Sequence, residues 1–413
     1  MKKLVTLFLT FCLGLTLCCV AFAEDPIVLD FWVRLNDDFS DEIAAFEATH
    51  PGIVINQIGK GSSYDDLVMA YNAAILANEL PEVGMVGQRH GIPQLYDAGV
   101  LLPIENFLTE EEQADVIDGF WYRYTYEGLR LAVPFQSSMP MLHYNETMLN
   151  ELGLEVPTTL TEMIECARQA VKDVDGDGAI DIYGFNMAGD VPFYIQPMVW
   201  GLGGTIIDED GNVNVVTDEM VKVYSMFAEM VQEGIMPANQ HSSAETDFCN
   251  GLSLFFMASC ASKGSVERVI GDSFVYNTTY FPASDGELNV CIGGNGLAIF
   301  ASTDEKQEAA AEFIRYMISP EAMRESTLRQ GYVPFTNAQF ADEYIQGQMQ
   351  DPRWALVLDQ VQYIRGQHVH PADSTIWNEM SALLSEVEAY PDMDITAALE
   401  KMQAEIDEFM MMY

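Results

Sequence analysis

Basic residues are scarce in this sequence. Its 413 residues include 19 Lys and Arg against 63 Asp and Glu, which gives a formal net charge of −44 at pH 7. Nucleic-acid binding depends on a basic surface, so this charge excludes DNA and RNA as partners. An anionic ligand would also be repelled at long range, and local hydrogen-bond donors would have to hold it.

Long hydrophobic runs are scarce as well, and the single one lies at the start. The run "LVTLFLTFCLGLTLCCV" follows Lys2 and Lys3 and leads to "AFA", a small-residue cleavage site that ends at Ala23. We predict a cleaved signal peptide, residues 1–23, and an exported, soluble mature protein in the periplasm or another extracytoplasmic space. An uncleaved anchor helix and a lipid anchor at Cys18 or Cys19 are the alternatives. The run is short for a membrane span, and no small residue precedes either cysteine.

Few cysteines remain once the predicted signal peptide is removed. They are Cys166, Cys249, Cys260 and Cys291. An oxidising compartment permits disulfides, and four cysteines allow three pairings. Buried free thiols fit the sequence equally well. The spacing is not that of a zinc site.

Signatures of catalysis are absent. The sequence contains no H-E-x-x-H zinc motif, no G-x-x-x-x-G-K-[ST] phosphate loop and no G-x-S-x-G elbow. The segments "GLGG" and "GGNG" do not complete a dinucleotide-binding fingerprint. His143, His368 and His370 stand in suggestive contexts, but an isolated histidine is more often structural. Nothing in these residues points to an organic cofactor or to an enzymatic activity. An exported glycoside hydrolase stays as an alternative, and it would need two carboxylates about 5–9.5 Å apart.

Strand-like and helix-like segments alternate along the chain. Strands are predicted at 27–33, 53–58 and 82–86, and helices at 40–52, where Ser40 is the expected N-cap, and at 64–80. This alternation favours an α/β domain with a largely parallel sheet. Further strands are expected within 129–145, 252–258 and 297–301, and further helices at 159–173, 217–234, 302–319 and 394–413. Thr217 is an expected N-cap, and Ser302 with Glu305 an expected capping box.

Aromatic residues lie at or near the predicted strand ends and loops, where open α/β sheets bind ligands. Aromatic faces beside Ser, Gln, Asn and Asp suit sugars and polyols. The aromatic residues in question are Trp32, Tyr64, Trp121, Tyr194, Trp200, Tyr332 and Trp377.

The segment "VKDVDGDGAIDIYGF" has the spacing of a calcium loop. Gly178 stands at its sixth position, where such loops turn sharply, and Gly184 stands at the twelfth, where a glutamate is usual. The missing glutamate argues against a calcium sensor, so we predict a structural Ca²⁺ that pins a loop; a turn without metal is the alternative. The predicted ligands are Asp173, Asp175, Asp177, Ala179 through its carbonyl, and Asp181.

Several motifs in a fixed order carry a family resemblance. They are "LDFWV", "FEATHPGIVI", "YDDL", "VPFQSSMPMLHYN", "LGLEVPTTLTEM", "CNGLSLFFMAS", "IGGNGLAIF", "FIRYMISPEAM" and "QGYVPFTNAQF". With them the chain resembles the extracellular solute-binding proteins of ABC importers, in the branch that takes up carbohydrates and glycerol 3-phosphate. The resemblance spans nearly the whole mature chain.

The resemblance implies an α/β, two-lobed periplasmic-binding-protein fold (type II, Venus-flytrap) with hinge crossings. The N-terminal lobe would comprise residues 24–136 plus about 290–338, and the C-terminal lobe 137–289 plus about 339–413. The protein would be a monomer that captures a sugar, oligosaccharide or polyol in the inter-lobe cleft and delivers it to the permease subunits in the membrane. A calcium-dependent adhesin is a further alternative, but its repeats are absent.

Ligand contacts follow from motif matching to glycerol-3-phosphate-binding members of the family. Asp373 falls about where those members grip phosphate with an arginine, and an aspartate would repel phosphate. A neutral sugar or polyol is therefore the expected solute. Glycerol 3-phosphate or a glycerophosphodiester is the alternative, with Arg34, Arg89 or Arg365 in place of the missing arginine. The implied contacts are Tyr64, Gln88, Ser138, Tyr194, Ser262, Gly294, Tyr332 and Asp373.

Overall fold

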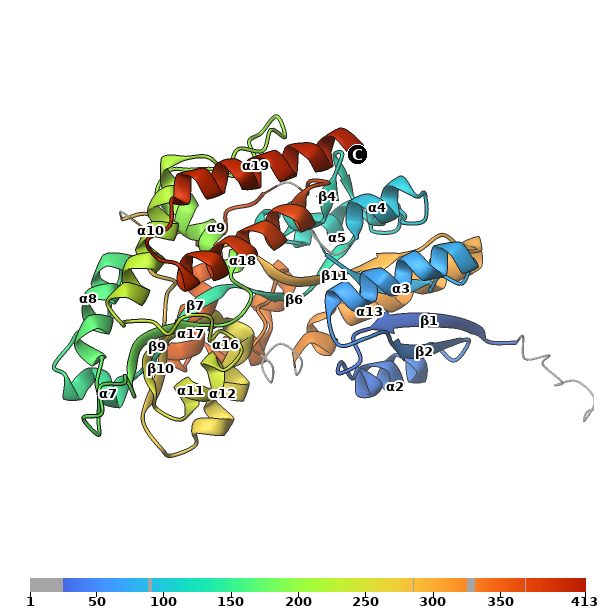
Figure 1. Ribbon diagram of the computed structural model, residues 1–413. Coiled ribbons are helices and arrows are strands. Elements are labelled where there is room, and N and C mark those ends of the chain that lie inside the picture. The colour runs from blue at the N-terminus through green and yellow to red at the C-terminus, as the bar shows by residue number, and fades with distance from the viewer. Residues whose placement is uncertain (1–24, 88–90, 285, 325–330, 368) are drawn as a thin grey trace, which may run out of the picture.

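A computed structural model describes residues 25–87, 91–284, 286–324, 331–367 and 369–413. The predicted signal peptide, Gln88, Arg89 and His368 lie outside the described residues. Two lobes, each built on a β-sheet that helices cover, meet in the middle of the molecule (Figure 1). Within the described ranges, no helix is both long and apolar enough to cross a membrane.

The first sheet has the strand order β2-β1-β3-β11-β6. β1 pairs in parallel with β2 and β3, whereas β11 pairs antiparallel with β3 and β6. The three strands predicted near the N-terminus are confirmed. The strands are β1 (Ile27–Val33), β2 (Ile53–Gly59), β3 (Val83–Val86), β6 (Val133–Ser138) and β11 (Gly293–Ile299).

Helices α2 (Ser40–Thr49), α3 (Tyr64–Ala77) and α13 (Asp304–Met317) belong to this first lobe. α2 packs on β2 and α13 packs on β1. α2 buries Ile43 and Phe46 on one face, as the helical spacing predicts.

The second sheet has the order β10-β7-β9-β8. Helices α8, α11 and α17 pack on β8, β9 and β10. α9, α10, α18 and α19 pack on one another beside this sheet. The elements are β7 (Pro140–Asn145), β8 (Tyr183–Met187), β9 (Ser253–Ser259), β10 (Tyr276–Thr279), α8 (Leu160–Ala170), α9 (Pro192–Gly201), α10 (Asp218–Gln232), α11 (Ala244–Cys249), α17 (Pro352–Asp359), α18 (Asp373–Ala389) and α19 (Ile395–Met412).

The remaining helices and strands are shorter. They are α4 (Ile92–Asp97), α5 (Glu110–Asp115), α6 (Asp118–Trp121), α7 (Glu146–Glu151), α12 (Lys263–Ile270), α15 (Asn337–Ala341), α16 (Glu343–Gln348), β4 (Thr125–Tyr126), β5 (Leu129–Arg130), η1 (Ile104–Asn106), η2 (Tyr122–Tyr124), η3 (Cys260–Ser262) and η4 (Gln360–Tyr363).

The chain crosses between the sheets more than once. β6 ends at Ser138 and β7 begins at Pro140, so the first crossing takes place at Met139. A second lies between β10 and β11. Two contacts bear on the third crossing: the Gln339 side chain donates to Ile318 O at 2.8 Å, and Arg324 pairs with Asp342 at 2.6 Å. They tie the chain up to Asp342 to residues at and just after the end of α13 in the first lobe. We therefore propose that the third crossing follows Asp342, later than the predicted boundary near 338.

Helix starts were predicted with mixed success. Thr217 caps α10 as expected, because its hydroxyl accepts from Met220 N at 3.2 Å. Two expected caps are wrong by one residue. Thr303, not Ser302, is the N-cap of α13, and its hydroxyl accepts from Lys306 N at 3.4 Å. In α2, Phe39 takes the N-cap position, and Ser40 is the first helical residue. Local sequence does not fix which of two adjacent residues takes the extended cap conformation.

The four cysteines among the described residues are free thiols. Cys249, Cys260 and Cys291 are buried, and burial raises the pKa of the Cys260 and Cys291 thiols to about 12. Of the two states that the sequence left open, the structure has the free thiols. They pack as small apolar side chains.

Candidate functional site

A cluster of polar and aromatic side chains gathers at one end of the first sheet. Tyr64, the first residue of α3, accepts a hydrogen bond from Asn295 Nδ2 at 2.8 Å, and the same amide donates to Gln136 Oε1 at 3.0 Å. The Arg34 guanidinium lies 4.5 Å from the centre of the Tyr64 ring. Burial raises the pKa of both Tyr64 and Tyr332, and the nearby Arg34 charge opposes this rise. The phenols therefore keep their protons and can donate.

Gly294 holds the backbone of this cluster in place. Its φ is +93°, and a Cβ there would lie 2.0 Å from Gln136 O, so no other residue fits without a shift of the chain. Gly294 follows Gly293, which pairs with Ser138 where β6 ends. The loop that carries Tyr332 is tied to the same strand, because Val333 N donates to Ser137 O at 2.8 Å.

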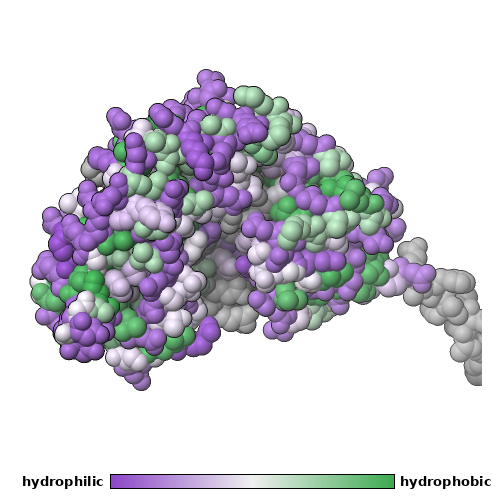
Figure 2. Space-filling model, viewed as in Figure 1, coloured by the Kyte–Doolittle hydropathy of each residue, from purple (hydrophilic) through white to green (hydrophobic). Residues whose placement is uncertain are grey.

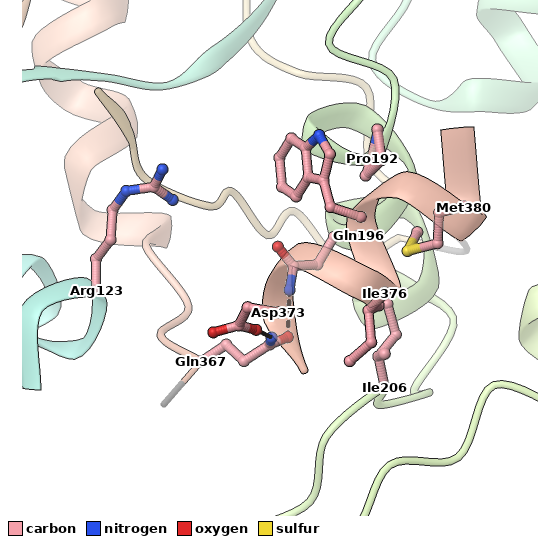
Figure 3. A pocket seen from close by; sticks show the side chains of 9 residues that line it. Arg123, Pro192, Gln196, Ile206, Gln367, Asp373, Ile376 and Met380 are labelled. Carbon is pink, nitrogen blue, oxygen red and sulfur yellow. Dashed lines mark hydrogen bonds between the residues drawn. The ribbon is translucent and has the colours of Figure 1, made fainter. Parts of the chain in front are cut away.

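A pocket lies between η2 on one side and helices α9 and α18 on the other. Arg123 enters it from η2, and Gln196, Gln367, Asp373 and Trp377 line the other side (Figure 3). Apolar walls complete it: Pro192, Ile206, Ile376 and Met380. The pocket thus combines hydrogen-bonding groups with an indole and aliphatic surface around a cavity of about 20 Å³.

The amides of this pocket are oriented by a chain of hydrogen bonds, which Figure 3 marks. The Gln196 side-chain amide donates to Gln367 Oε1, and Gln367 Nε2 donates to Asp373 Oδ1 at 3.3 Å. Asp373 also accepts from His370 N at 2.7 Å. Asp373, near the start of α18, thereby fixes both glutamines.

Two arginines stand beside this pocket. Arg123 is buried, and its Nη1 donates to Ile292 O at 2.8 Å. Arg365 lines the neighbouring space with Trp200; its Nη1 donates to Trp200 O at 3.4 Å, and its Cζ lies 5.2 Å from the Trp200 ring. Burial lowers the pKa of Arg365 from its usual value, which still leaves the group charged at neutral pH.

Comparison with known families decides the class of this site. A family model described as bacterial extracellular solute-binding protein matches residues 42–350. The chain belongs to this family. It is an extracellular solute-binding protein, and this family consists of binding proteins, not enzymes. The predicted extracytoplasmic location is that of the family.

Individual relatives within the family agree with this assignment. The chain is 26% identical over 357 residues to the sn-glycerol-3-phosphate-binding periplasmic protein UgpB of Escherichia coli, with 79% of this chain and 78% of that protein covered. UgpB from Mycobacterium tuberculosis in complex with glycerophosphocholine has a TM-score of 0.82 at 21% identity, covering 94% and 98%. Maltotriose-bound MalE from Bdellovibrio bacteriovorus has a TM-score of 0.78 at 17% identity, and the match covers 93% of this chain and 100% of that one. The predicted two-lobed fold is confirmed.

The solute contacts implied by the family motifs do not all lie together. Five of them lie on separate elements: Tyr64 begins α3, Ser138 ends β6, Ser262 ends η3, Gly294 lies in β11, and Tyr332 follows Gly331 in a loop. Asp373 lines the pocket of Figure 3 instead. Gln88 lies outside the described residues.

Tyr194 does not line the pocket of Figure 3, and its contact with a solute stays a prediction. Its side chain is 1% exposed in the interior of α9 and packs edge-on against Phe193 at 5.4 Å, so it offers no surface to a solute in this conformation. α9 is apolar on nearly every side, and its buried face cannot be told from sequence. Gln196 is the polar exception in this helix and reaches the pocket, which is a signal the sequence did contain. Arg123 had no such signal, because its carbonyl partner Ile292 is 169 residues away.

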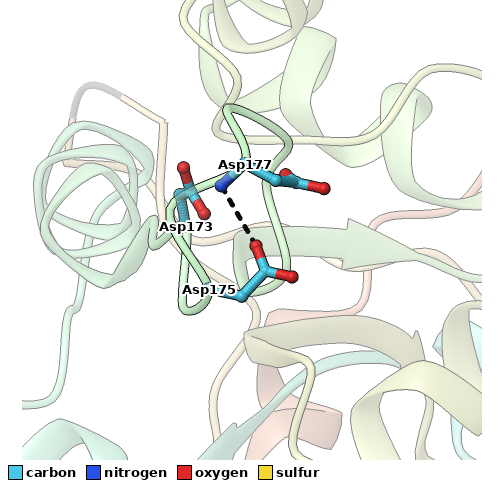
Figure 4. A group of neighbouring side chains, drawn as sticks. All are labelled: Asp173, Asp175 and Asp177. Atoms are coloured by element: carbon cyan, nitrogen blue, oxygen red, sulfur yellow. Dashed lines mark hydrogen bonds between the residues drawn. The ribbon is translucent and has the colours of Figure 1, made fainter.

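The calcium-like loop forms a compact acidic turn. Carboxylate oxygens of Asp173, Asp175 and Asp177 lie within 4.8 Å of one another on the surface (Figure 4). Asp173 accepts from Gly176 N at 2.7 Å and from Gly178 N at 2.9 Å, which closes the turn. Asp181, the predicted fourth carboxylate, lies outside this group and accepts from Val174 N at 2.7 Å.

The twelfth position of this loop cannot carry the usual glutamate. A Cβ on Gly184 would lie 2.0 Å from Ala167 O, because β8 crosses α8 in close contact there. Packing therefore explains why the loop lacks its bidentate ligand. Any ion would be held by fewer protein oxygens than in a sensor loop.

Proposed function

We propose that this protein captures a neutral sugar, oligosaccharide or polyol between its lobes and delivers it to the permease of an ABC importer. The observation that carries the proposal is the pocket to which both lobes contribute, with two oriented glutamines, one carboxylate and an indole. Amides and carboxylates read hydroxyl groups, while the Trp377 face offers stacking area. The solute would bind the closed form more tightly and shift the population of lobe positions toward it.

The proposal of a neutral solute rests on the charges in and near the pocket. Asp373 presents a carboxylate to the same pocket as Arg123. The negative charge of this carboxylate would repel a phosphate group there. Arg34 is held by Asp37 through two contacts of 2.9 Å, so its charge is largely compensated. Asp373 is also the one carboxylate among the residues that line the pocket, whereas glycoside hydrolysis needs two.

A thermal-shift screen of refolded, ligand-free mature protein tests this function. We expect a neutral sugar or polyol to raise the melting temperature, because a ligand at a hundred times its Kd stabilises by about 2.7 kcal/mol. The Trp377→Ala variant should lose the shift, and Tyr390→Ala should keep it, since Tyr390 is 68% exposed at the end of the same helix. A shift with sn-glycerol 3-phosphate or glycerophosphocholine, and with no neutral compound, would contradict the proposal.

We also propose that the acidic turn holds a Ca²⁺ as a structural clip. Asp173, Asp175 and Asp177 would supply carboxylate oxygens, and Ala179 its carbonyl; the ion would neutralise their mutual repulsion. With no glutamate at Gly184, we expect a Kd of about 0.1–1 mM.

Calorimetric titration with CaCl₂ measures this affinity. Asp175→Asn should abolish the heat, whereas Asp210→Asn, in the exposed turn near Asp208, should leave it unchanged. If Asp175→Asn leaves the isotherm unchanged, the assignment of the calcium site is wrong. The absence of heat up to about 10 mM Ca²⁺ would contradict it as well.

A further inference from the structure

Helix α19 acts as an arm fixed to the C-terminal lobe. It packs on α10 and α18, buries Leu399, Met402 and Ile406, and is tied down through Gln403. The Gln403 side chain accepts from Val215 N at 2.9 Å and donates to Val213 O at 3.2 Å. Its 18 residues span about 27 Å, and its far end lies beside α4 and β4 of the other lobe (Figure 1).

The end of this arm makes a hydrogen-bonded contact with the N-terminal lobe. The Tyr413 hydroxyl donates to Asp97 Oδ2 and lies 3.4 Å from the Tyr126 hydroxyl. Asp97 is the last residue of α4, which Ile92 and Leu95 anchor in the core. We call Asp97, Tyr126 and Tyr413 the clasp. A phenol that donates to a carboxylate forms a charge-assisted bond, about twice as strong as a neutral one.

The clasp stands next to the candidate pocket. Tyr126 and Tyr413 line a groove of about 590 Å³ together with Asp208, Gly211 and His370. The same His370 donates its backbone N–H to Asp373, and Arg123 lies one short turn before Tyr126 in the chain. In Figure 1 the C-terminal end of α19 lies near α4 and β4 in the upper part of the molecule, and Figure 2, in the same view, shows a hollow between the lobes at the lower edge.

We propose that the clasp holds the lobes together over the pocket and thereby sets solute affinity from outside it. The inference rests on the proposed function. If solute binds the closed form, its apparent Kd equals the intrinsic Kd divided by the closed fraction, so any contact made only when the lobes meet tightens binding. Tyr413 is thus a positioning residue that needs no contact with the solute.

Two substitutions test the clasp without touching the pocket. Tyr413→Phe removes the donor and Asp97→Asn removes the charged acceptor. We expect each to weaken solute binding about three- to tenfold, seen as faster dissociation, because each loses one charge-assisted bond of the closed form. The pair should be non-additive, since both break the same bond. Tyr390→Phe is the matched control, because this phenol is exposed and the structure shows no hydrogen bond to its hydroxyl from the described residues.

A readout without solute separates this inference from the proposed function. Spin labels at Leu76→Cys and Val269→Cys, both strongly exposed and in different lobes, report the inter-lobe distance by pulsed electron resonance, with Cys166 changed to Ser. Tyr413→Phe should broaden the distance distribution of ligand-free protein toward open lobes, and Tyr390→Phe should not. Unchanged distances and affinities, or tighter binding in Tyr413→Phe, would overturn the clasp even if a neutral sugar binds. If no solute class binds any variant, the proposed function fails instead, and the distances still decide whether the clasp exists.

Discussion

Replacing Gly294 with alanine is expected to abolish solute binding and to lower the free energy of unfolding by roughly 3 kcal/mol or more. The φ of +93° is costly for any residue with a Cβ, and the added methyl group would stand 2.0 Å from Gln136 O. β11 would have to move away from β6. That movement would displace Asn295 from Tyr64 and Gln136, so the hydrogen bonds of the cluster would be lost together.

Gly286→Ala separates the two causes of this effect. Gly286 has a φ of +94°, nearly that of Gly294, but a Cβ there meets nothing within 4 Å. Urea unfolding, followed by tryptophan fluorescence, should show a loss of about 1 kcal/mol for Gly286→Ala and a much larger one for Gly294→Ala. Equal losses would mean that the close contact with β6 is not what requires glycine at 294.

Replacing Glu388 with alanine is the second large expected effect, a loss of about 3–5 kcal/mol in the free energy of unfolding. Glu388 is 2% exposed. Its carboxylate accepts from Asn239 N at 2.5 Å and faces His241 Nε2 at 2.9 Å, while His241 Nδ1 lies 3.2 Å from Met187 O. Both ring nitrogens thus face acceptors, so the imidazolium form is favoured. The variant would leave two donors, Asn239 N and His241 Nε2, without their acceptor.

This pair also predicts a pH dependence. Burial works to lower the pKa of His241, but the hydrogen bond and charge of Glu388 outweigh it, and the pKa is raised. A raised folded-state pKa stabilises the fold below the unfolded value of about 6.5, and this stabilisation is lost as pH rises through the folded value. The gap between wild type and Glu388→Ala should therefore be wider at about pH 6 than at about pH 9.

An exposed glutamate on the same helix provides the control for this pair. Glu386→Ala should change stability by less than about 0.5 kcal/mol at every pH. A pH-independent gap between wild type and Glu388→Ala would show that His241 is not protonated in the folded protein.

Secondary structure followed from the sequence because its causes are local. The alternation of "IVLDFWV" and the helical spacing of Ile43 and Phe46 each report one buried face, and the structure has both. Order along the sheets did not follow from local pattern. β11 pairs with β3 and β6, from which some 150 residues or more of chain separate it, and only the family resemblance carried that information.

The candidate site was predicted in part for the same reason. Tyr64, Gly294 and Tyr332 were chosen because they lie in short family motifs, and their contact with a solute stays a prediction. Arg123 and Gln196 have no motif, and they meet Asp373 only because the lobes bring α9, α18 and η2 together. Tyr194 is buried in α9, and one turn of an apolar helix decides whether an aromatic ring faces the core or a pocket.

The most direct test of the central claim is calorimetric titration of refolded, ligand-free mature protein, once with sn-glycerol 3-phosphate and once with the neutral compound that gives the largest thermal shift. We expect saturable heat from the neutral compound and none from the phosphate, because Asp373 presents a carboxylate to the pocket. Saturable heat from glycerol 3-phosphate alone would contradict this claim, and would assign phosphate recognition to Arg123, Arg365 or Arg34.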